Sequence, residues 1–426
     1  MSILFTISNN LTTIYTPRIG SPNISISVRI LAGSMYESEE EIGVAHFLEH
    51  IVFDGTEKYP SEKEISELID NRGGYRNGST NKETVEYIVK VLKEDIETAF
   101  DYLSQIIISP LCLEKSIEKE KKIIEQEIYR FKSDPEKLAP RLIYSILFPG
   151  TRLGKLNTGD VDDINKIDRD KILSYLNRNY CASNMVISIC GDTSKEYIKE
   201  LIEKYFGKIP SGKKISPMEV KHFELKNGTH YIEIMPNIKQ ANLTVGYHGH
   251  KYNTNSRESY AMDLISNVLS RGKSSRLVNE IREKRGLAYV VNSNNHTGRN
   301  FGLFTIGVGL AEKNIDNCLQ IIDEQTADIH KNLLSEELDK AYTFIKVGLS
   351  FALENSLTEA SMYSNMWCST GILKSVENEL AKYAEVANDR DFVKEVAKNI
   401  FSKNHAILII NSNKEGTPNQ ERITHR

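Results

Sequence analysis

The sequence has few cysteines, no long apolar run and no surplus of positive charge, and each of these absences excludes a class of protein. The five cysteines are scattered and form no CxxC pair, as is typical of free thiols in a reducing compartment. No window of about 18 apolar residues occurs, so we expect no membrane-spanning helix and no membrane partner. The formal net charge of −4 gives no general basic surface, so we expect no nucleic-acid partner.

The length and composition are those of a globular protein with more than one domain. Hydrophobic residues make up 40% and charged residues 26% of the 426 residues. A chain of this length fits two domains of about 200 residues each. Residues 1–18 lack the basic head, apolar core and small-residue cleavage site of a signal peptide, so we expect a cytoplasmic protein.

An internal repeat divides the chain into two related halves. The alternating apolar and polar pattern of Ile24–Val28 predicts a strand, and it returns 219 positions later at Leu243–Tyr247. Lys93 and Glu312 are also 219 positions apart, and each lies between a predicted strand and an amphipathic helix. Two separate matches at one offset predict two homologous halves.

The boundary between the halves is predicted from a polar segment rich in glycine and proline. We predict a first domain over residues 1–210, a linker over 211–222 and a homologous second domain over 223–426. Strands alternate with several helices in each half. The predicted fold class is therefore α+β, with two homologous domains that are each a mostly antiparallel sheet packed with helices.

The segment Gly43–Phe53 carries the strongest chemical signal. Its apolar spacing predicts a helix on which His46 and His50, four residues apart, share one face. Two imidazoles so placed can bind one zinc ion at about 2.0–2.1 Å each. Glu49 can reach a metal-bound water without being a ligand, and this order inverts the HExxH helix of zinc proteases. A helix with two surface histidines would give the same pattern, so the spacing alone leaves both interpretations open.

A catalytic zinc ion needs a third protein ligand and an open coordination position. The helical stretch Glu118–Ile128 carries Glu120 and Glu127, which are seven residues apart and share a face. We predict Glu127 as the third ligand and Glu120 as an outer carboxylate or an auxiliary acid–base group. A solvated run of charges on a helix face is the alternative interpretation.

The repeat provides an independent test of this assignment. A histidine or carboxylate required by the fold should recur in both halves, whereas one required by a metal need not. The positions 219 residues after the three predicted ligands and Glu49 hold three apolar residues and a lysine: Ile265, Val268, Leu269 and Lys346. We therefore predict one metal site per chain, in the first half.

These motifs resemble those of the pitrilysin family of zinc peptidases, in the half-length branch that includes mitochondrial processing peptidase and many bacterial processing proteases. The resemblance covers most of the chain. It departs at residues 269–273, where one glycine stands in a loop that often has several in relatives. The matching segments are His46–His50, Phe53–Thr56, Gly73–Asn77, Glu120–Glu127, Ser274–Leu277 and Arg282–Tyr289.

The resemblance implies a zinc-dependent endopeptidase in which Glu49 is the general base and Glu120 is a second catalytic carboxylate. It also implies that Arg282 and Tyr289 contact the substrate near the scissile bond. Asn77 is expected to bind the substrate backbone or to support Glu49.

The resemblance also implies a partner. Full-length relatives pack four such domains around a closed chamber, and this chain has two. We therefore expect a homodimer with shared active sites, in which the metal of one chain meets Tyr289 of the other, and substrates that are short or unfolded peptides. The alternative is a non-catalytic partner or scaffold subunit, but such chains usually lack the zinc ligands or the arginine–tyrosine pair. An unrelated metal-dependent hydrolase would leave Arg282 and Tyr289 without a role.

Overall fold

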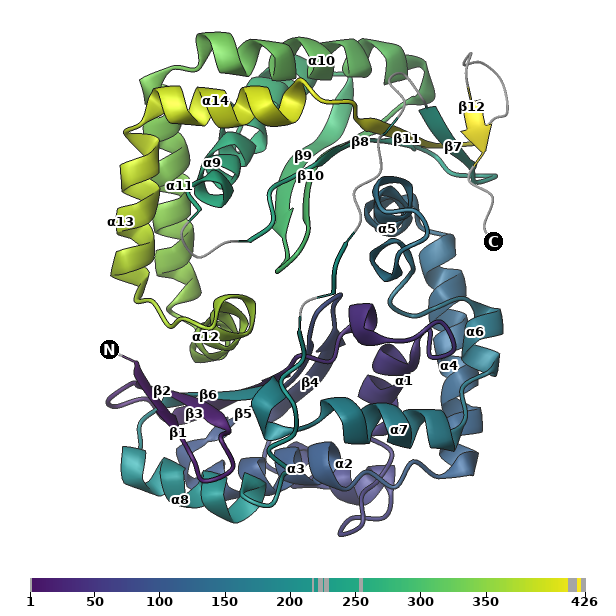
Figure 1. Ribbon diagram of the computed structural model, residues 1–426. Helices are drawn as coiled ribbons and strands as arrows, with labels where there is room; N and C mark the ends of the chain where they lie inside the picture. The colour runs from purple at the N-terminus through teal and green to yellow at the C-terminus, as the bar shows by residue number, and fades with distance from the viewer. Residues whose placement is uncertain are drawn as a thin grey trace. The chain divides into compact units, whose positions relative to one another are not determined.

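Two six-stranded sheets organise the chain, each with its own set of helices (Figure 1). The structure is a computed structural model, and it describes residues 2–216, 218–220, 225, 230–252, 256–412 and 420–422. Unit 1 comprises residues 1–128, 155–218 and 350–375, and unit 2 comprises residues 129–154, 219–349 and 376–426. The predicted linker at 211–222 includes residues 217, 221 and 222, which lie outside the described residues.

The sheet of unit 1 has the strand order β1-β2-β6-β3-β5-β4. Neighbouring strands are antiparallel except for β2 and β6, which are parallel. Among the described strands, β4 pairs with β5 alone and so forms an edge of the sheet. The strand bounds are β1 (Ile3–Thr6), β2 (Thr12–Pro17), β3 (Asn23–Ile30), β4 (Tyr75–Thr80), β5 (Val85–Leu92) and β6 (Met185–Gly191).

The sheet of unit 2 has the order β12-β7-β11-β8-β10-β9, and its strands β7 to β11 repeat the arrangement of β2 to β6. The outer strands differ, because β12 is parallel to β7 whereas β1 is antiparallel to β2. The short turns η2 (Lys93–Asp95) and η6 (Glu312–Asn314), which follow β5 and β10, lie at the predicted offset of 219. The α+β class and the two homologous, mostly antiparallel sheets are therefore confirmed. The strand bounds are β7 (His230–Ile234), β8 (Ala241–His248), β9 (Ala288–Thr297), β10 (Gly302–Leu310), β11 (Ala406–Asn411) and β12 (Gln420–Arg422).

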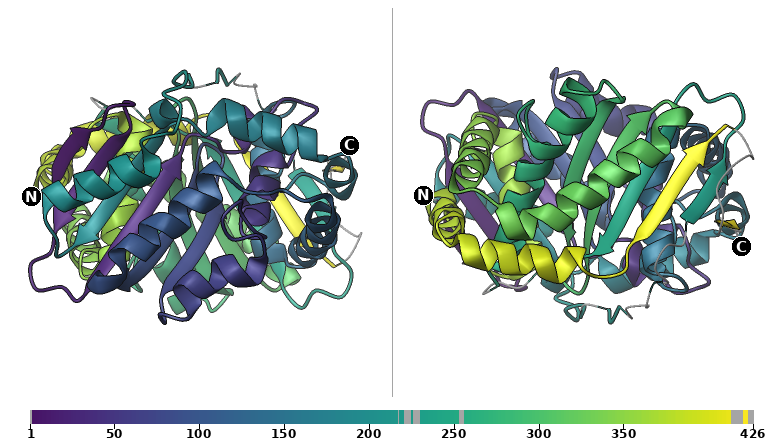
Figure 2. Two further views of the ribbon diagram at one scale, coloured as in Figure 1. Left: turned by 90° about the horizontal axis from the view of Figure 1, so that it is seen from below. Right: turned by 90° about the horizontal axis from the view of Figure 1, so that it is seen from above.

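Helices cover both faces of each sheet. In unit 1, α3 and α8 lie across the strands on one face, and in unit 2 the green α10 and yellow α14 do so (Figure 2). The helices of unit 1 include α1 (Val44–Ile51), α2 (Glu62–Asp70), α3 (Ile96–Ile108), most of α4 (Glu114–Lys132), α6 (Val161–Asn165), α7 (Arg169–Asn179) and α8 (Lys195–Phe206). Those of unit 2 include α9 (Glu258–Ser270), α10 (Ile315–Asn332), most of α11 (Ser335–Ala352), α13 (Val376–Ala387) and α14 (Arg390–Phe401).

Each sheet is completed by one helix from the opposite half of the sequence. Helix α12 (Ser356–Thr370) lies on β3 and β6 of unit 1, and α5 (Pro135–Leu147) lies on β8 and β11 of unit 2. The contact in unit 1 combines an apolar cluster with polar contacts, since Ser25 and Ser27 form buried hydrogen bonds of 2.8 Å to Ser356 and Ser364. The contact in unit 2 is apolar, because α5 packs the side chain of Ile143 onto Gly246 of β8.

Separate apolar cores stabilise the two units. One cluster of buried side chains lies in unit 1, around strands β3 and β5 and helices α1 and α3. A second lies in unit 2, around β8, β10, α9 and α14. Within the part of the chain that the structure describes, no helix has the combined length and hydrophobicity needed to cross a membrane.

The packing of α5 on the unit 2 sheet can be tested by adding a single methyl group at Gly246. A Cβ added at Gly246 would lie 2.6 Å from Cγ1 of Ile143, so Gly246→Ala should overpack this contact and lower the free energy of unfolding by about 1–3 kcal/mol. Gly309, on β10, is the matched control because its added Cβ would meet nothing nearer than 3.6 Å. Chemical denaturation of both variants measures the difference; equal stability would contradict this packing.

Candidate metal centre

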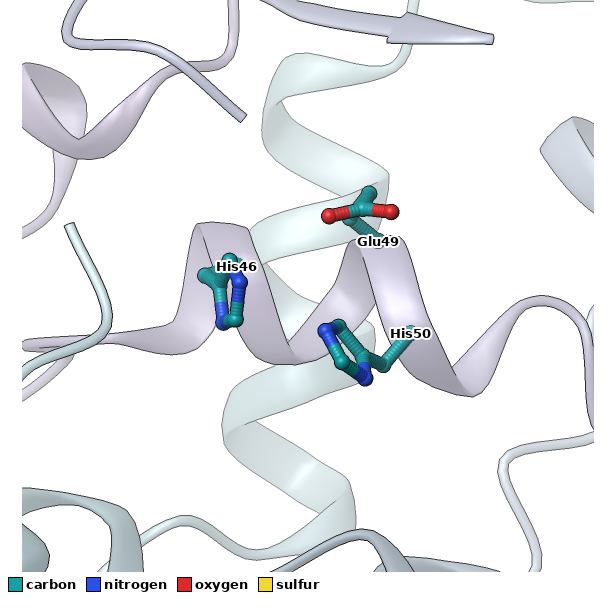
Figure 3. A group of neighbouring side chains, drawn as sticks. All are labelled: His46, Glu49 and His50. Carbon is teal, nitrogen blue, oxygen red and sulfur yellow. The ribbon is translucent and has the colours of Figure 1, made fainter. Parts of the chain in front are cut away.

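Helix α1 presents two distinct faces. Four apolar side chains are fully buried in the unit 1 core: Val44, Phe47, Leu48 and Ile51. This leaves His46, Glu49 and His50 together on the other side of the helix (Figure 3). The side chains of His46 and Glu49 are themselves buried, at 8% and 9% exposed, so the polar face of this helix is not a solvated surface. That observation argues against two ordinary surface histidines.

Helix α4 brings a carboxylate to both imidazoles. Oε2 of Glu127 lies 3.6 Å from Nε2 of His46 and 3.7 Å from Nε2 of His50. A tetrahedral zinc ion with bonds of about 2.0–2.1 Å holds its ligand atoms about 3.3 Å apart. Both distances are within a few tenths of an ångström of that separation, so Glu127 and each imidazole are spaced as two ligands of one zinc ion. Donors of the His₂Glu type are also those of known catalytic zinc sites.

Glu120 orients the second histidine. Its Oε2 lies 3.2 Å from Nδ1 of His50, and its side chain is 5% exposed. A hydrogen bond at Nδ1 leaves Nε2 free to face Glu127, which is how outer carboxylates fix metal-binding imidazoles. Although burial alone would lower it, the hydrogen bond to Glu120 and the nearby carboxylates raise the pKa of His50.

Glu49 is a second candidate for the third ligand, since its carboxylate lies within 4.8 Å of both histidine ligand atoms. The predicted ligand Glu127 fits that role better, because one of its oxygens lies at nearly equal distances from the two Nε2 atoms. Glu49 instead faces β4, where Oγ1 of Thr80 lies 3.5 Å from its Oε2. Burial, with the charge of Glu127, raises the pKa of Glu49 to about 6. A carboxylate with this pKa is suited to accept a proton near neutral pH.

Strand β4 supports Glu49 through two residues that the sequence analysis missed. A Cβ at Gly78 would collide with Oε1 of Glu49, so any larger residue there would displace the Glu49 carboxylate from its present position. Gly78 and Thr80 share one face of the strand, whereas Asn77 lies on the other face and is exposed. Thr80, not Asn77, is therefore the residue that contacts Glu49. A glycine inside a predicted strand is a signal of such a close approach.

The remaining predicted residues, Arg282 and Tyr289, lie in unit 2. Arg282 is in η5 (Val278–Glu283). Tyr289 is the second residue of β9 and is exposed. The guanidinium carbon of Arg282 lies 5.0 Å from the centroid of the Tyr289 ring, a cation–π contact. Tyr289 is 73% exposed, which is unusual for a large aromatic side chain and leaves its hydroxyl available to a ligand.

In the equivalent helix of unit 2, buried apolar side chains replace the predicted metal-binding residues. Ile265, Val268 and Leu269 lie in α9 and are 0–5% exposed. Lys346, the counterpart of Glu127, lies in α11 and is exposed. The repeated backbone therefore does not require histidine or glutamate at these positions.

Two family models match consecutive parts of the chain. The model described as insulinase (peptidase family M16) matches residues 14–159, which include His46, Glu49, His50, Glu120 and Glu127. The model described as peptidase M16 inactive domain matches residues 166–343, which include Arg282 and Tyr289.

Two relatives in sequence match over more than four fifths of both chains, and a third matches over less than half. An uncharacterized zinc protease of Rickettsia felis is 31% identical over 350 residues, covering 82% of this chain and 83% of the relative. One of Bacillus subtilis is 28% identical over 389 residues, covering 91% and 93%. The beta subunit of mitochondrial-processing peptidase of Dictyostelium discoideum is 34% identical over 185 residues, covering 43% and 39%. The family resemblance seen in the motifs is therefore confirmed.

Solved structures share the fold over nearly the whole chain. A protease from Helicobacter pylori has a TM-score of 0.85 at 20% identity, covering 96% of this chain and 99% of the other. A peptidase M16 inactive domain from Pseudomonas fluorescens has a TM-score of 0.84 at 18% identity, covering 98% and 100%.

The distances around the two histidines predict that substitutions at different positions of α4 weaken zinc binding to different degrees. Glu127→Gln removes the assigned ligand and should weaken zinc binding by more than the roughly 10–100-fold that loss of an outer partner costs. Glu120→Gln should fall within that 10–100-fold range, because it acts through His50. Glu118→Gln is the control, since Glu118 is exposed on the same helix and pairs with Lys121. Competition with a chromophoric chelator measures all three; equal affinities would exclude this ligand set.

Proposed function

Because the chain belongs to peptidase family M16, we propose that it is a zinc-dependent endopeptidase with its catalytic centre on α1 and α4. The observation that carries this proposal is the position of Glu127, whose oxygen lies 3.6–3.7 Å from both imidazole nitrogens. Bound zinc supplies Lewis-acid polarisation of the scissile carbonyl and lowers the pKa of water. His46, His50 and Glu127 hold the ion, and Glu120 keeps the His50 ring in its binding orientation.

Glu49 is the general base of this proposal. It accepts a proton from the attacking water and delivers it to the leaving amine. The pKa of about 6 keeps the carboxylate largely ionised at neutral pH and still basic enough to take up a proton. Thr80 and the close backbone of Gly78 hold Glu49 in place for both transfers.

Edge strand β4 is the proposed binding surface for the peptide. A free sheet edge binds an extended peptide through backbone hydrogen bonds. Gly78 lies against Glu49 on this strand, so a peptide paired with β4 passes beside the catalytic carboxylate. A tightly folded substrate cannot supply a free extended segment. The proposed substrates are therefore short or unfolded peptides, including segments removed during processing of a longer chain.

The general-base assignment predicts that Glu49→Gln keeps its zinc but loses at least roughly 10²-fold in peptide turnover, the usual scale for a general base. The glutamine is isosteric, so the helix and its histidines stay intact. Zinc content and turnover measured on the same sample separate this result from simple metal loss. Wild-type turnover in the variant would remove Glu49 from the mechanism. A wild-type chain that binds zinc but cleaves no unfolded peptide would instead favour a scaffold subunit.

The homodimer is proposed because the chain has only two of the four domains of full-length relatives. Arg282 and Tyr289 belong to unit 2 and the zinc ligands to unit 1. In the proposed dimer, Tyr289 of one chain hydrogen-bonds the developing oxyanion at the zinc site of its partner.

Mixing two inactive variants tests this sharing. Glu49→Gln and Tyr289→Phe should each be nearly inactive, yet subunit exchange should restore activity to about a quarter of wild type, by random pairing of the two chains in a symmetric dimer. In the mixed dimer one site collects both lesions and the other site is intact. If both groups came from one chain, every site would carry a lesion and mixing would restore nothing.

A further inference from the structure

Helix α1 cannot cap its own first turn. Its N-cap residue is Gly43, which has no side chain to accept a hydrogen bond and adopts a φ of +88°. A Cβ at Gly43 would lie 2.6 Å from the carbonyl oxygen of Thr158, so serine or aspartate has no room there. The first turn also carries no acidic residue. The free amides at the start of this helix therefore need an acceptor from elsewhere in the chain.

Glu37 supplies that acceptor. Its Oε2 accepts a hydrogen bond from the amide of Gly43 at 3.0 Å, and its Oε1 accepts one from the amide of Ala45 at 2.9 Å. The side chain is 3% exposed. A carboxylate at a helix N-terminus is favoured both by these charged hydrogen bonds and by the helix dipole. Ala45 directly precedes His46, so the contact acts on the turn that carries the first histidine.

The segment that carries Glu37 is itself fixed to the end of β4. The amide of Ser34 donates to the carbonyl of Asn81 at 3.2 Å, and that of Met35 donates to the carbonyl of Lys82 at 2.8 Å. Both carbonyls belong to the turn between β4 and β5. Oγ of Ser34 also donates to Asn157 at 2.9 Å, and Asn157 in turn donates to the carbonyl of Thr80 at 3.2 Å.

We propose that Glu37 is a positioning residue that fixes α1 relative to strand β4, and so sets the separation of His46 and Glu49 from the peptide-binding edge. The proposal rests on the proposed function for its consequence in catalysis, but the contact itself can be tested without turnover. Residues 34–37 thus connect the turn after β4 to the amides of Gly43 and Ala45 at the start of α1. Loss of the carboxylate lets the start of α1 move, which separates His46 from His50 and Glu127.

Glu37→Gln is the test variant, because the amide keeps the size of the side chain but has one acceptor oxygen for two backbone donors. Glu41→Gln is the matched control. Glu41 lies in the same loop and is 8% exposed, and its two oxygens bind Arg178 at 3.0 and 2.8 Å and the amide of Ser38 at 2.9 Å instead of α1. Its backbone carbonyl, which accepts from the amide of Val44, is unchanged by the substitution.

Three quantities should separate the two variants. In Glu37→Gln, the amides of Gly43 and Ala45 should exchange hydrogen faster in metal-free protein, and zinc affinity should fall about 10-fold, the lower end of the range for outer partners. At saturating zinc, kcat should fall with KM nearly unchanged, because the helix and not the strand has moved. Glu41→Gln should lose comparable global stability but keep wild-type values of all three.

Glu37→Asp provides a second test variant if Glu37→Gln folds poorly. It keeps the charge and both oxygens with a shorter reach, so amide protection and zinc affinity should lie between those of wild type and Glu37→Gln. Unchanged exchange at Gly43 and Ala45 in Glu37→Gln would overturn the proposal, as would an equal loss of zinc affinity in Glu41→Gln. Failure of the wild type to cleave peptide would count against the proposed function alone, since exchange is read on metal-free protein.

Discussion

The proposed metal centre of the first unit depends on two imidazoles and three carboxylates that share one largely buried space. Glu49, Glu120 and Glu127 converge on His46 and His50, and buried carboxylates so close together repel each other unless a positive charge lies between them. In the proposed function, a divalent ion bound to the two Nε2 atoms and to Glu127 would supply that charge. The fold provides the geometry by crossing α4 over α1, which brings Glu120 and Glu127 to the two histidines.

Much of this site could be predicted from the sequence because its signals are periodic and local. The four-residue spacing of His46 and His50 places both on one helix face in any α-helix. The repeat at an offset of 219 then identified these residues as additions to the fold, and in α9 the equivalent positions are indeed buried apolar residues. The same repeat predicted a sheet in each half. The strands β3 and β8 could be predicted because the alternation of apolar and polar residues depends only on the sequence of each strand.

The parts that could not be predicted depend on contacts between residues far apart in the sequence. Helices α5 and α12 occupy equivalent positions in the two halves, yet each packs on the sheet of the opposite half. Their amphipathic patterns indicate that one face of each helix is buried, but they do not indicate on which sheet that face packs. Glu37 and Thr80 likewise had no periodic signal, because a hydrogen bond from a loop carboxylate or a strand hydroxyl requires the folded backbone on both sides.

The central claim is that α1 and α4 together hold a zinc ion with two imidazole nitrogens and a carboxylate. An X-ray absorption spectrum of the zinc-loaded protein tests it most directly, because it reports the elements and distances of the atoms bound to the metal. The account predicts two imidazoles and oxygen donors at about 2.0–2.1 Å, with no sulfur. A spectrum without imidazole scattering, or with sulfur at about 2.3 Å, would contradict it.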